Sequence, residues 1–179
     1  MKAELISKCN QIIAQIMATK KKYFIIHYTG VNADTSAANI SWYHKVFLRW
    51  SRDGYHHLLN TDGVIEDLEP LWARVNGCRS TGWFKNSNEE YVGINAYQIC
   101  FETLQNLKMS KTQDEVFTYL LTELVNKYPD ILIGGHREFP DFTSPTKRQQ
   151  TACPGFSVSD WLISKGIPKR NIFYEAVKI

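Results

Sequence analysis

Uninterrupted apolar runs alternate with segments of helical periodicity along this chain, and this alternation restricts the folds open to it. Residues 23–28 and 131–134 are almost wholly apolar, as is typical of strands buried on both faces of a sheet. Between them, residues 113–127 repeat apolar side chains at helical spacing, and Pro129 follows the end of the pattern. The alternation predicts an α/β domain with a mixed central β-sheet flanked by helices.

An antiparallel hairpin is predicted at one edge of this sheet. Residues 55–60 and 64–68 have strand character and flank the turn signal Asp62-Gly63. Alternation within the first strand places Tyr55 and His57 on one face and His56 on the other. Residues 96–101 predict a further strand.

Three helices are predicted besides 113–127. A helix from residue 35 or 36 should bury one apolar face, and His44 within it should be partly exposed. That face would consist of Ile40, Tyr43, Phe47 and Trp50. Thr112 and Glu115 suggest a capping box for the 113–127 helix, and a last helix is expected over 158–165.

The third is an amphipathic helix over residues 3–19. A membrane-surface helix is the alternative, but the polar face is rich in Gln, Asn and Ser as well as Lys, which favours packing on a core. Residues 1–22 have no continuous apolar core of a secretory signal, and no stretch approaches the roughly 20 apolar residues of a membrane span. We therefore expect a cytoplasmic protein without a transmembrane segment.

Composition fits one globular domain. The chain has 179 residues, 44% of them apolar, which is enough for a sizeable core. A net charge of +3 is too small to indicate nucleic acid as a partner. The four cysteines show no CxxC spacing, so reduced thiols are expected rather than a disulfide framework.

Three residues far apart in the chain are candidate metal ligands. His27 and His136 leave the carboxyl ends of apolar strands, where parallel sheets place their sites, and Cys153 lies in a loop before the last helix. Two imidazoles and a thiolate are three of the four ligands of tetrahedral zinc, and an open fourth position is typical of a catalytic site. A residue of either type in such a position, taken alone, is more often structural than a ligand, and His56 or His57 could supply a spare ligand.

With these segments laid out, the chain resembles the zinc-dependent N-acetylmuramoyl-L-alanine amidases of the bacteriophage-lysozyme and peptidoglycan-recognition-protein type, from about residue 23 to 167. Four motifs carry the resemblance, in the order of the family: Ile26-His27-Tyr28-Thr29, Gly54-Tyr55-His56, Gly135-His136-Arg137-Glu138 and Ala152-Cys153-Pro154-Gly155-Phe156. The resemblance implies an amidase catalytic domain over residues 23–179, and the amphipathic helix within residues 1–22, which has no secure counterpart in the family, would precede it.

The resemblance also implies roles for single residues. His27, His136 and Cys153 would bind one zinc ion. Tyr55 matches the catalytic tyrosine, although a strand tyrosine packed in the core is the alternative. Thr151 occupies a position where relatives carry lysine or threonine, and its hydroxyl could donate to an oxyanion.

Substrate-binding roles are implied for Thr29 and Asn95, which could equally be loop and strand-start residues. Relatives often have a Gly-x-His stretch where this chain has Gly77-Cys78-Arg79, so Arg79 would contact a carboxylate or carbonyl of the stem peptide instead. Residues 70–93 are expected to form a long loop. Where some relatives have a glutamate near the zinc, this chain has Cys100.

Such an enzyme would hydrolyse the amide between N-acetylmuramic acid and L-alanine in peptidoglycan or muropeptides. We expect a monomeric endolysin of the phage type, made in the cytoplasm and acting on the cell wall after release. An intracellular amidase that recycles wall fragments, an injected antibacterial effector, a non-catalytic peptidoglycan-recognition module and a protein that inhibits a partner enzyme are the alternatives.

Overall fold

The computed structural model describes residues 2–31, 34–78, 95–103, 108–139 and 151–173. Within these ranges, one mixed sheet has the strand order β3-β2-β4-β1-β5. Its strands are β1 (Tyr23–Tyr28), β2 (His57–Leu59), β3 (Ile65–Asp67), β4 (Ala96–Phe101) and β5 (Leu132–Gly135). β2 and β3 pair antiparallel, and the other neighbours pair parallel. The predicted α/β fold with a hairpin edge is confirmed.

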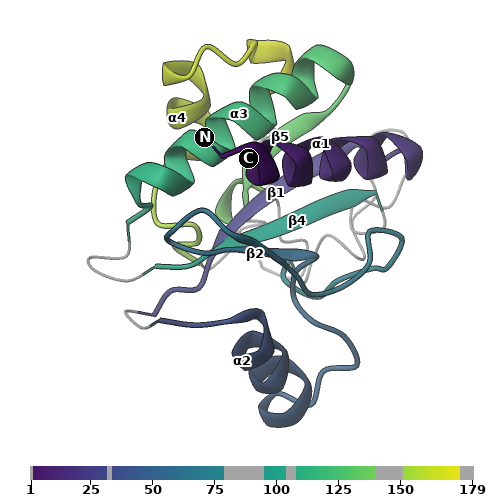
Figure 1. The fold of residues 1–179 in the computed structure, drawn as a ribbon, viewed down its shortest axis with the longest axis vertical. Helices are drawn as coiled ribbons and strands as arrows, with labels where there is room; N and C mark the ends of the chain where they lie inside the picture. Colours follow the sequence, from purple (N-terminus) through teal and green to yellow (C-terminus); the bar gives the residue numbers. More distant parts are fainter. Residues whose placement is uncertain (1, 32–33, 79–94, 104–107, 140–150, 174–179) are drawn as a thin grey trace, which may run out of the picture.

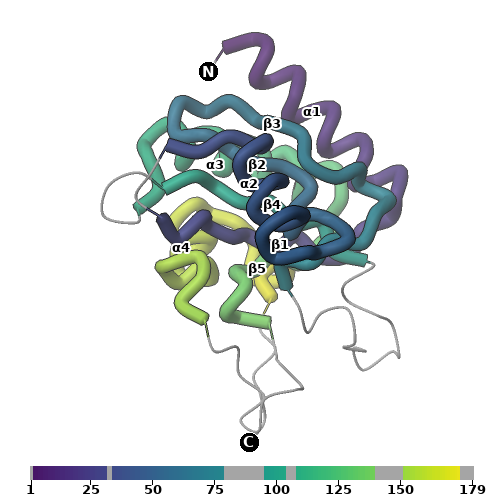
Figure 2. Tube along the Cα trace, turned by 90° about the horizontal axis from the view of Figure 1, so that it is seen from below, coloured from purple at the N-terminus to yellow at the C-terminus, as the bar shows by residue number. Residues whose placement is uncertain are grey.

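The helices lie on both sides of this sheet. Figure 1 shows α1 (Ala3–Ala18), α3 (Lys111–Lys127) and α4 (Val158–Ser164) on one side and α2 (Ala37–Trp42) on the other. Seen from below, α2 stands in front of the strands (Figure 2). The largest apolar cluster fills the space between the sheet and the helices α1, α3 and α4. Among the described segments, no helix has the length and apolar character needed to cross a bilayer.

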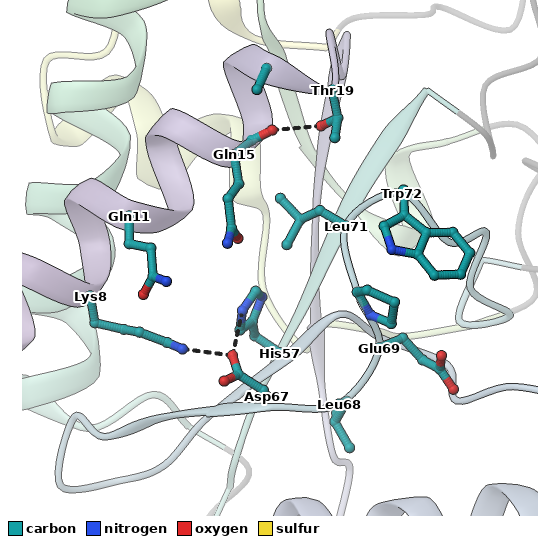
Figure 3. Close-up of a pocket in the computed structure, with 12 residues that line it drawn as sticks. Lys8, Gln11, Gln15, Thr19, His57, Asp67, Leu68, Glu69, Leu71 and Trp72 are labelled. Carbon is teal, nitrogen blue, oxygen red and sulfur yellow. Dashed lines mark hydrogen bonds and ion pairs between the residues drawn. The ribbon is translucent and has the colours of Figure 1, made fainter.

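α1 is part of this core. Its buried side chains are at most 1% exposed: Cys9, Ile12, Ile13 and Ile16. On the flank of the helix, Lys8 Nζ lies 2.6 Å from Asp67 Oδ1, which lies 2.9 Å from His57 Nε2 (Figure 3). The prediction of core packing, rather than of a membrane-surface helix, is confirmed.

The predicted apolar face of the helix after residue 35 is wrong beyond Ile40. Ser36 caps α2 by accepting a hydrogen bond from the Asn39 N–H, but the chain then widens into a π-helical turn, η1 (Tyr43–Phe47). A π turn holds more residues than an α turn and shifts every following side chain around the axis. Phe47 is therefore 64% exposed. His44, expected to be partly exposed, is buried because it follows Ala37 and Ile40 at helical spacing on the buried face.

Two further boundaries differ from the predictions. The capping box of α3 consists of Ser110 and Gln113, because their side chains and backbone N–H groups exchange both hydrogen bonds, and not of Thr112 and Glu115.

β2 begins only at His57, so strand alternation does not govern Tyr55. Tyr55 lies against His27, while His57 lines the side facing α1, so the predicted common face is wrong. Residues 79–93 of the predicted long loop lie outside the described residues.

Candidate metal centre

The fold brings His27, His136 and Cys153 together. β1 and β5 are parallel neighbours with Ile26 opposite Gly135, so His27 and His136 follow at the same sheet edge. Cys153 joins them from the segment that leads into α4. The potential ligand atoms of the three residues all lie within 4.8 Å of one another.

The spacing and chemistry of these atoms fit zinc. Cys153 Sγ lies 3.7 Å from His27 Nδ1. Tetrahedral zinc, with bonds of about 2.3 Å to sulfur and about 2.0–2.1 Å to nitrogen, would separate the two atoms by roughly 3.5 Å. Two nitrogens and one sulfur are a donor set that zinc prefers. The ligand role of these residues stays a prediction.

Gly135 and Glu138 hold the turn at His136 and the loop of Cys153 together. A Cβ atom on Gly135 would come within 2.7 Å of Pro154 Cδ, so only glycine lets the cysteine loop approach this closely. The backbone N–H of Arg137 then donates to the Cys153 carbonyl at 2.9 Å. Glu138 accepts from the Gly135 N–H with one carboxylate oxygen and from the Val158 and Ser159 N–H groups with the other.

Burial keeps His27 and Cys153 uncharged in the absence of a cation. It lowers the pKa of His27 well below its usual value, and the neighbouring His136 lowers it further. Burial also raises the pKa of the Cys153 thiol to about 12, although the Tyr28 N–H, 3.4 Å from Sγ, opposes the shift. A divalent cation would reverse the preference of the thiol, because coordination favours the thiolate.

Tyr55 borders these three residues. Its ring centroid lies 4.9 Å from that of His27. Burial raises its pKa well above 10, with the nearby Cys100 and Cys153 thiols adding to the shift, so the phenol is a hydrogen-bond donor at neutral pH. Gly77 packs beneath the ring, where a Cβ would come within 2.7 Å of Tyr55 Cε1.

A cavity of about 370 Å³ opens beside Tyr55. His44, which the sequence did not identify, lies in its wall together with Thr29 and Thr35. The His44 ring stacks on Trp50 at 4.8 Å, and its Nδ1 accepts the Gly54 N–H at 3.1 Å. Little in the sequence indicated this role for His44, because a histidine in the middle of a helical pattern is usually exposed.

A model of the N-acetylmuramoyl-L-alanine amidase family, Amidase_2, matches residues 17–156. The chain belongs to this family. The match includes the strand with His27, the Tyr55 segment, His136 and Cys153. No curated protein sequence matches the chain.

Solved structures of amidase and recognition proteins share the fold. The endolysin N-acetylmuramoyl-L-alanine amidase LysCS from Clostridium intestinale URNW is 22% identical, with a TM-score of 0.59 over 83% of this chain and 86% of that one. Drosophila PGRP-LB is 17% identical, with a TM-score of 0.60 over 87% and 84%. Human PGRP-IBETAC, in complex with glycosamyl muramyl pentapeptide, is 20% identical, with a TM-score of 0.53 over 70% and 77%.

The other residues predicted for this amidase-family site lie at varying distance from it. Thr151 Oγ1 accepts the Cys153 N–H at 3.1 Å and so shapes the cysteine loop. Thr29 lines the cavity, but its hydroxyl also accepts the Thr103 N–H at 3.1 Å and lies 3.0 Å from Thr103 Oγ1. Their catalytic and substrate-binding roles stay predictions.

Asn95 lies far from the candidate ligands. It precedes β4, five residues before Cys100, the register partner of His27, which corresponds to about 16 Å along a strand. Its carbonyl accepts the Lys22 and Tyr23 N–H groups. Arg79 lies outside the described residues. Both substrate-binding assignments stay predictions.

Gln98 is a residue of the site that the sequence did not identify. Its Oε1 lies 2.9 Å from His27 Nε2, at the far side of the ring from Cys153. The two spare histidines are engaged elsewhere: His56 Nε2 lies 3.1 Å from the Ala73 carbonyl, and His57 contacts Asp67. Neither belongs to the possible metal-binding group found among the described residues.

A second cavity, of about 580 Å³, lies between α1 and residues 67–72 (Figure 3). His57, Asp67 and Lys8 line it and pair with one another, and the Tyr97 hydroxyl lies 3.0 Å from His57 Nδ1. These contacts connect α1 with β2 and β3, so this lining is explained by the packing of the helix.

Proposed function

We propose that this chain is a zinc-dependent N-acetylmuramoyl-L-alanine amidase, which hydrolyses the amide between N-acetylmuramic acid and L-alanine in peptidoglycan. The observation that carries the proposal is the convergence of the His27, His136 and Cys153 ligand atoms within 4.8 Å beside Tyr55. Family membership supports the reaction class. The retained donor set supports a catalytic member.

His27, His136 and Cys153 would hold one zinc ion. When bound, zinc lowers the pKa of a water molecule towards neutrality and polarises a scissile carbonyl. As ligands, two imidazoles contribute no charge and the thiolate contributes one negative charge, so the protein ligands would neutralise only part of the charge of the metal. The burial of His27 and Cys153 excludes bulk water and strengthens electrostatic interactions at the site.

Tyr55 would stabilise the charge that develops on the carbonyl oxygen. Its phenol remains protonated at neutral pH and can donate a hydrogen bond to an oxyanion. Thr151 shapes the cysteine loop through the Cys153 N–H, and its hydroxyl hydrogen is not used in that contact. It is the second candidate donor.

The cavity beside Tyr55 would receive the substrate. Its volume of about 370 Å³ suits part of a muropeptide rather than a whole strand, and α2 and η1 form one wall. We propose that the protein is a monomeric endolysin that acts on the cell wall after release from the cytoplasm. A wall-recycling amidase would use the same chemistry, and small muropeptides as substrates in place of intact sacculi would distinguish it.

A non-catalytic recognition module is the second candidate, because a solved structure with this fold holds a muramyl pentapeptide. Such a module would bind the same ligand without needing zinc. The presence of all three ligand candidates and of Tyr55 in one place favours the enzyme.

Digestion of purified peptidoglycan tests the proposal. The zinc-loaded protein should release new L-alanine amino termini without new reducing sugar ends. Chelation or Cys153→Ser should abolish the release, whereas Cys9→Ala, which changes a buried thiol in α1, should retain it. Full activity and metal content in Cys153→Ser would exclude the proposed site, and wall binding without turnover at saturating zinc would favour the recognition module.

A further inference from the structure

The Gln98 side chain is buried behind the candidate ligand His27. Gln98 is 0% exposed and His27 is 1% exposed. The residues lie on neighbouring parallel strands, and Gln98 is the register partner of Ile25, two positions before His27. Their side chains therefore share the sheet face that carries the metal centre. Gln98 Oε1 lies 2.9 Å from His27 Nε2.

This contact determines which nitrogen of His27 can bind a metal. An amide oxygen only accepts hydrogen bonds, so the proton of the neutral imidazole must lie on Nε2. Nδ1 then keeps its lone pair, and Nδ1 is the atom that lies 3.7 Å from Cys153 Sγ. With the amide turned round, Nε2 would accept instead, Nδ1 would carry the proton, and Nδ1 could not be a ligand.

The backbone of Gln98 is fixed on the side away from His27. Its N–H donates to His56 Nδ1 at 3.0 Å, and its carbonyl accepts the His56 N–H at 2.9 Å. His56 is 0% exposed. Gln98 thus lies in a buried, hydrogen-bonded part of the sheet from which its amide oxygen reaches the ring.

The amide nitrogen of Gln98 has no evident structural use. Among the described residues, Gln98 Nε2 is buried without a hydrogen-bond partner. A buried amide N–H left unpaired costs free energy, commonly about 1–3 kcal/mol. An apolar side chain would avoid this cost, so the oxygen contact to His27 is the interaction that the glutamine supplies.

We propose that Gln98 is a positioning residue for the metal: it selects the His27 tautomer and holds the ring so that Nδ1 faces the metal position. The inference rests on the proposed zinc function and extends it to a residue that does not itself touch the metal. Outer partners of ligating histidines typically change metal affinity 10–100-fold when they are removed.

Zinc affinity of the full-length protein tests this role directly. Gln98→Leu removes the acceptor, and we expect its zinc dissociation constant, measured by chelator competition, to rise 10–100-fold. Gln98→Glu keeps an acceptor and cannot donate when ionised, so it should bind zinc at least as tightly as wild type. The Co²⁺-loaded Glu variant should keep the visible absorption bands of tetrahedral thiolate ligation.

Gln113→Leu is the matched control. Gln113 is also 0% exposed, but its Nε2 donates to the Leu59 and Glu102 carbonyls and its Oε1 accepts the Ser110 N–H. This variant should lose stability and keep the wild-type zinc affinity in its folded fraction. A general effect of removing a buried glutamine is thereby separated from an effect on His27.

Each result of these experiments bears on the positioning role of Gln98, on the proposed function, or on both. Wild-type affinity in Gln98→Leu, or a loss in Gln98→Glu of more than tenfold, would overturn the positioning role. Should Gln98→Leu fail to fold, the affinity and Co²⁺ spectrum of Gln98→Glu decide alone. Absence of zinc binding by wild type would overturn both proposals. Zinc binding without hydrolysis would overturn the proposed function only, because the affinities still report on Gln98.

Discussion

The ring of His44 lies edge-on against the ring of Tyr55, with the centroids 5.5 Å apart. The two residues come from different segments, and His44 lies on the buried face of the helix, at helical spacing from Ala37 and Ile40. His44 Nδ1 also accepts the N–H of Gly54, the residue before Tyr55, at 3.1 Å. The His44 side chain therefore supports the candidate catalytic tyrosine in two ways: it packs against the tyrosine ring, and it holds the backbone just before Tyr55.

Replacement of His44 should weaken this support. In His44→Ala the buried Gly54 N–H loses its acceptor, so the free energy of unfolding should fall by about 1–3 kcal/mol and amide hydrolysis should slow. His44→Asn supplies a carbonyl oxygen in a similar place and should recover part of both losses. Urea unfolding and turnover of a muropeptide measure the two effects, and equal behaviour of the two variants would contradict the hydrogen-bond argument.

Removal of the Tyr55 hydroxyl should affect chemistry alone. Tyr55→Phe keeps the ring against His27 but has no donor for a developing oxyanion, so kcat should fall about 10²–10³-fold. Zinc affinity should not change. Tyr97→Phe is the control, because Tyr97 is also buried but its hydroxyl contacts His57 on the other side of the sheet. Unchanged kcat in Tyr55→Phe would assign the tyrosine to packing.

Glu138 should hold the His136 turn to the helix after the cysteine loop. Glu138→Ala leaves the Gly135, Val158 and Ser159 N–H groups without their acceptor, so we expect a loss of about 2–4 kcal/mol and weaker zinc binding. Glu115→Ala removes an exposed helix pair with Lys111 and should cost less than about 0.5 kcal/mol. Thermal unfolding and zinc titration of the two variants check the difference.

Two buried histidines should make the protein less stable in acid. Burial lowers the pKa of His57 to about 4 and that of His56 to about 3, whereas both should titrate near 6.5 in the unfolded chain. As the pH falls below 6.5, the unfolded state takes up protons that the folded state does not, so the free energy of unfolding falls. For His57 the loss should reach roughly 2 kcal/mol at pH 4.5.

Urea unfolding at pH 7, 5.5 and 4.5 measures this dependence. His57→Gln should show a smaller loss between pH 7 and 4.5 than wild type, because one of the buried titrating groups is gone. Lys8, Asp67 and Tyr97 surround His57. Burial alone would raise the pKa of Asp67, but its contacts with Lys8 and His57 together outweigh this effect and lower it, so Asp67 should stay ionised over most of this range. An unchanged pH dependence in His57→Gln would argue against the shift.

The N-terminal helix should contribute strongly to stability. Ile12 is 0% exposed, and Ile12→Ala should cost about 2–5 kcal/mol by leaving a cavity between α1 and α3. Gln15→Ala on the exposed face should have little effect. Urea midpoints of the two variants give the comparison, and equal midpoints would mean that α1 is dispensable for the core.

The sequence by itself determined the strands and the candidate ligands. The apolar runs ending in His27 and before His136 predict buried parallel strands, and parallel strands bring their carboxyl ends to one edge whatever the rest of the chain does. The bounds of β1 and β4 agree with the prediction residue for residue, because neither strand relies on turn chemistry to define its ends.

Only the tertiary structure decided what surrounds these residues. Phe47 turns outward because a π turn breaks the helical period, and periodicity cannot reveal one extra residue. Gln98 reaches His27 through the register of two strands 71 positions apart, and a buried glutamine in an apolar strand carries no local sign of its partner. Asn95 is likewise placed by register, at the end of β4 remote from His27. Sequence patterns report local periodicity and burial, whereas the pairing of distant side chains depends on packing.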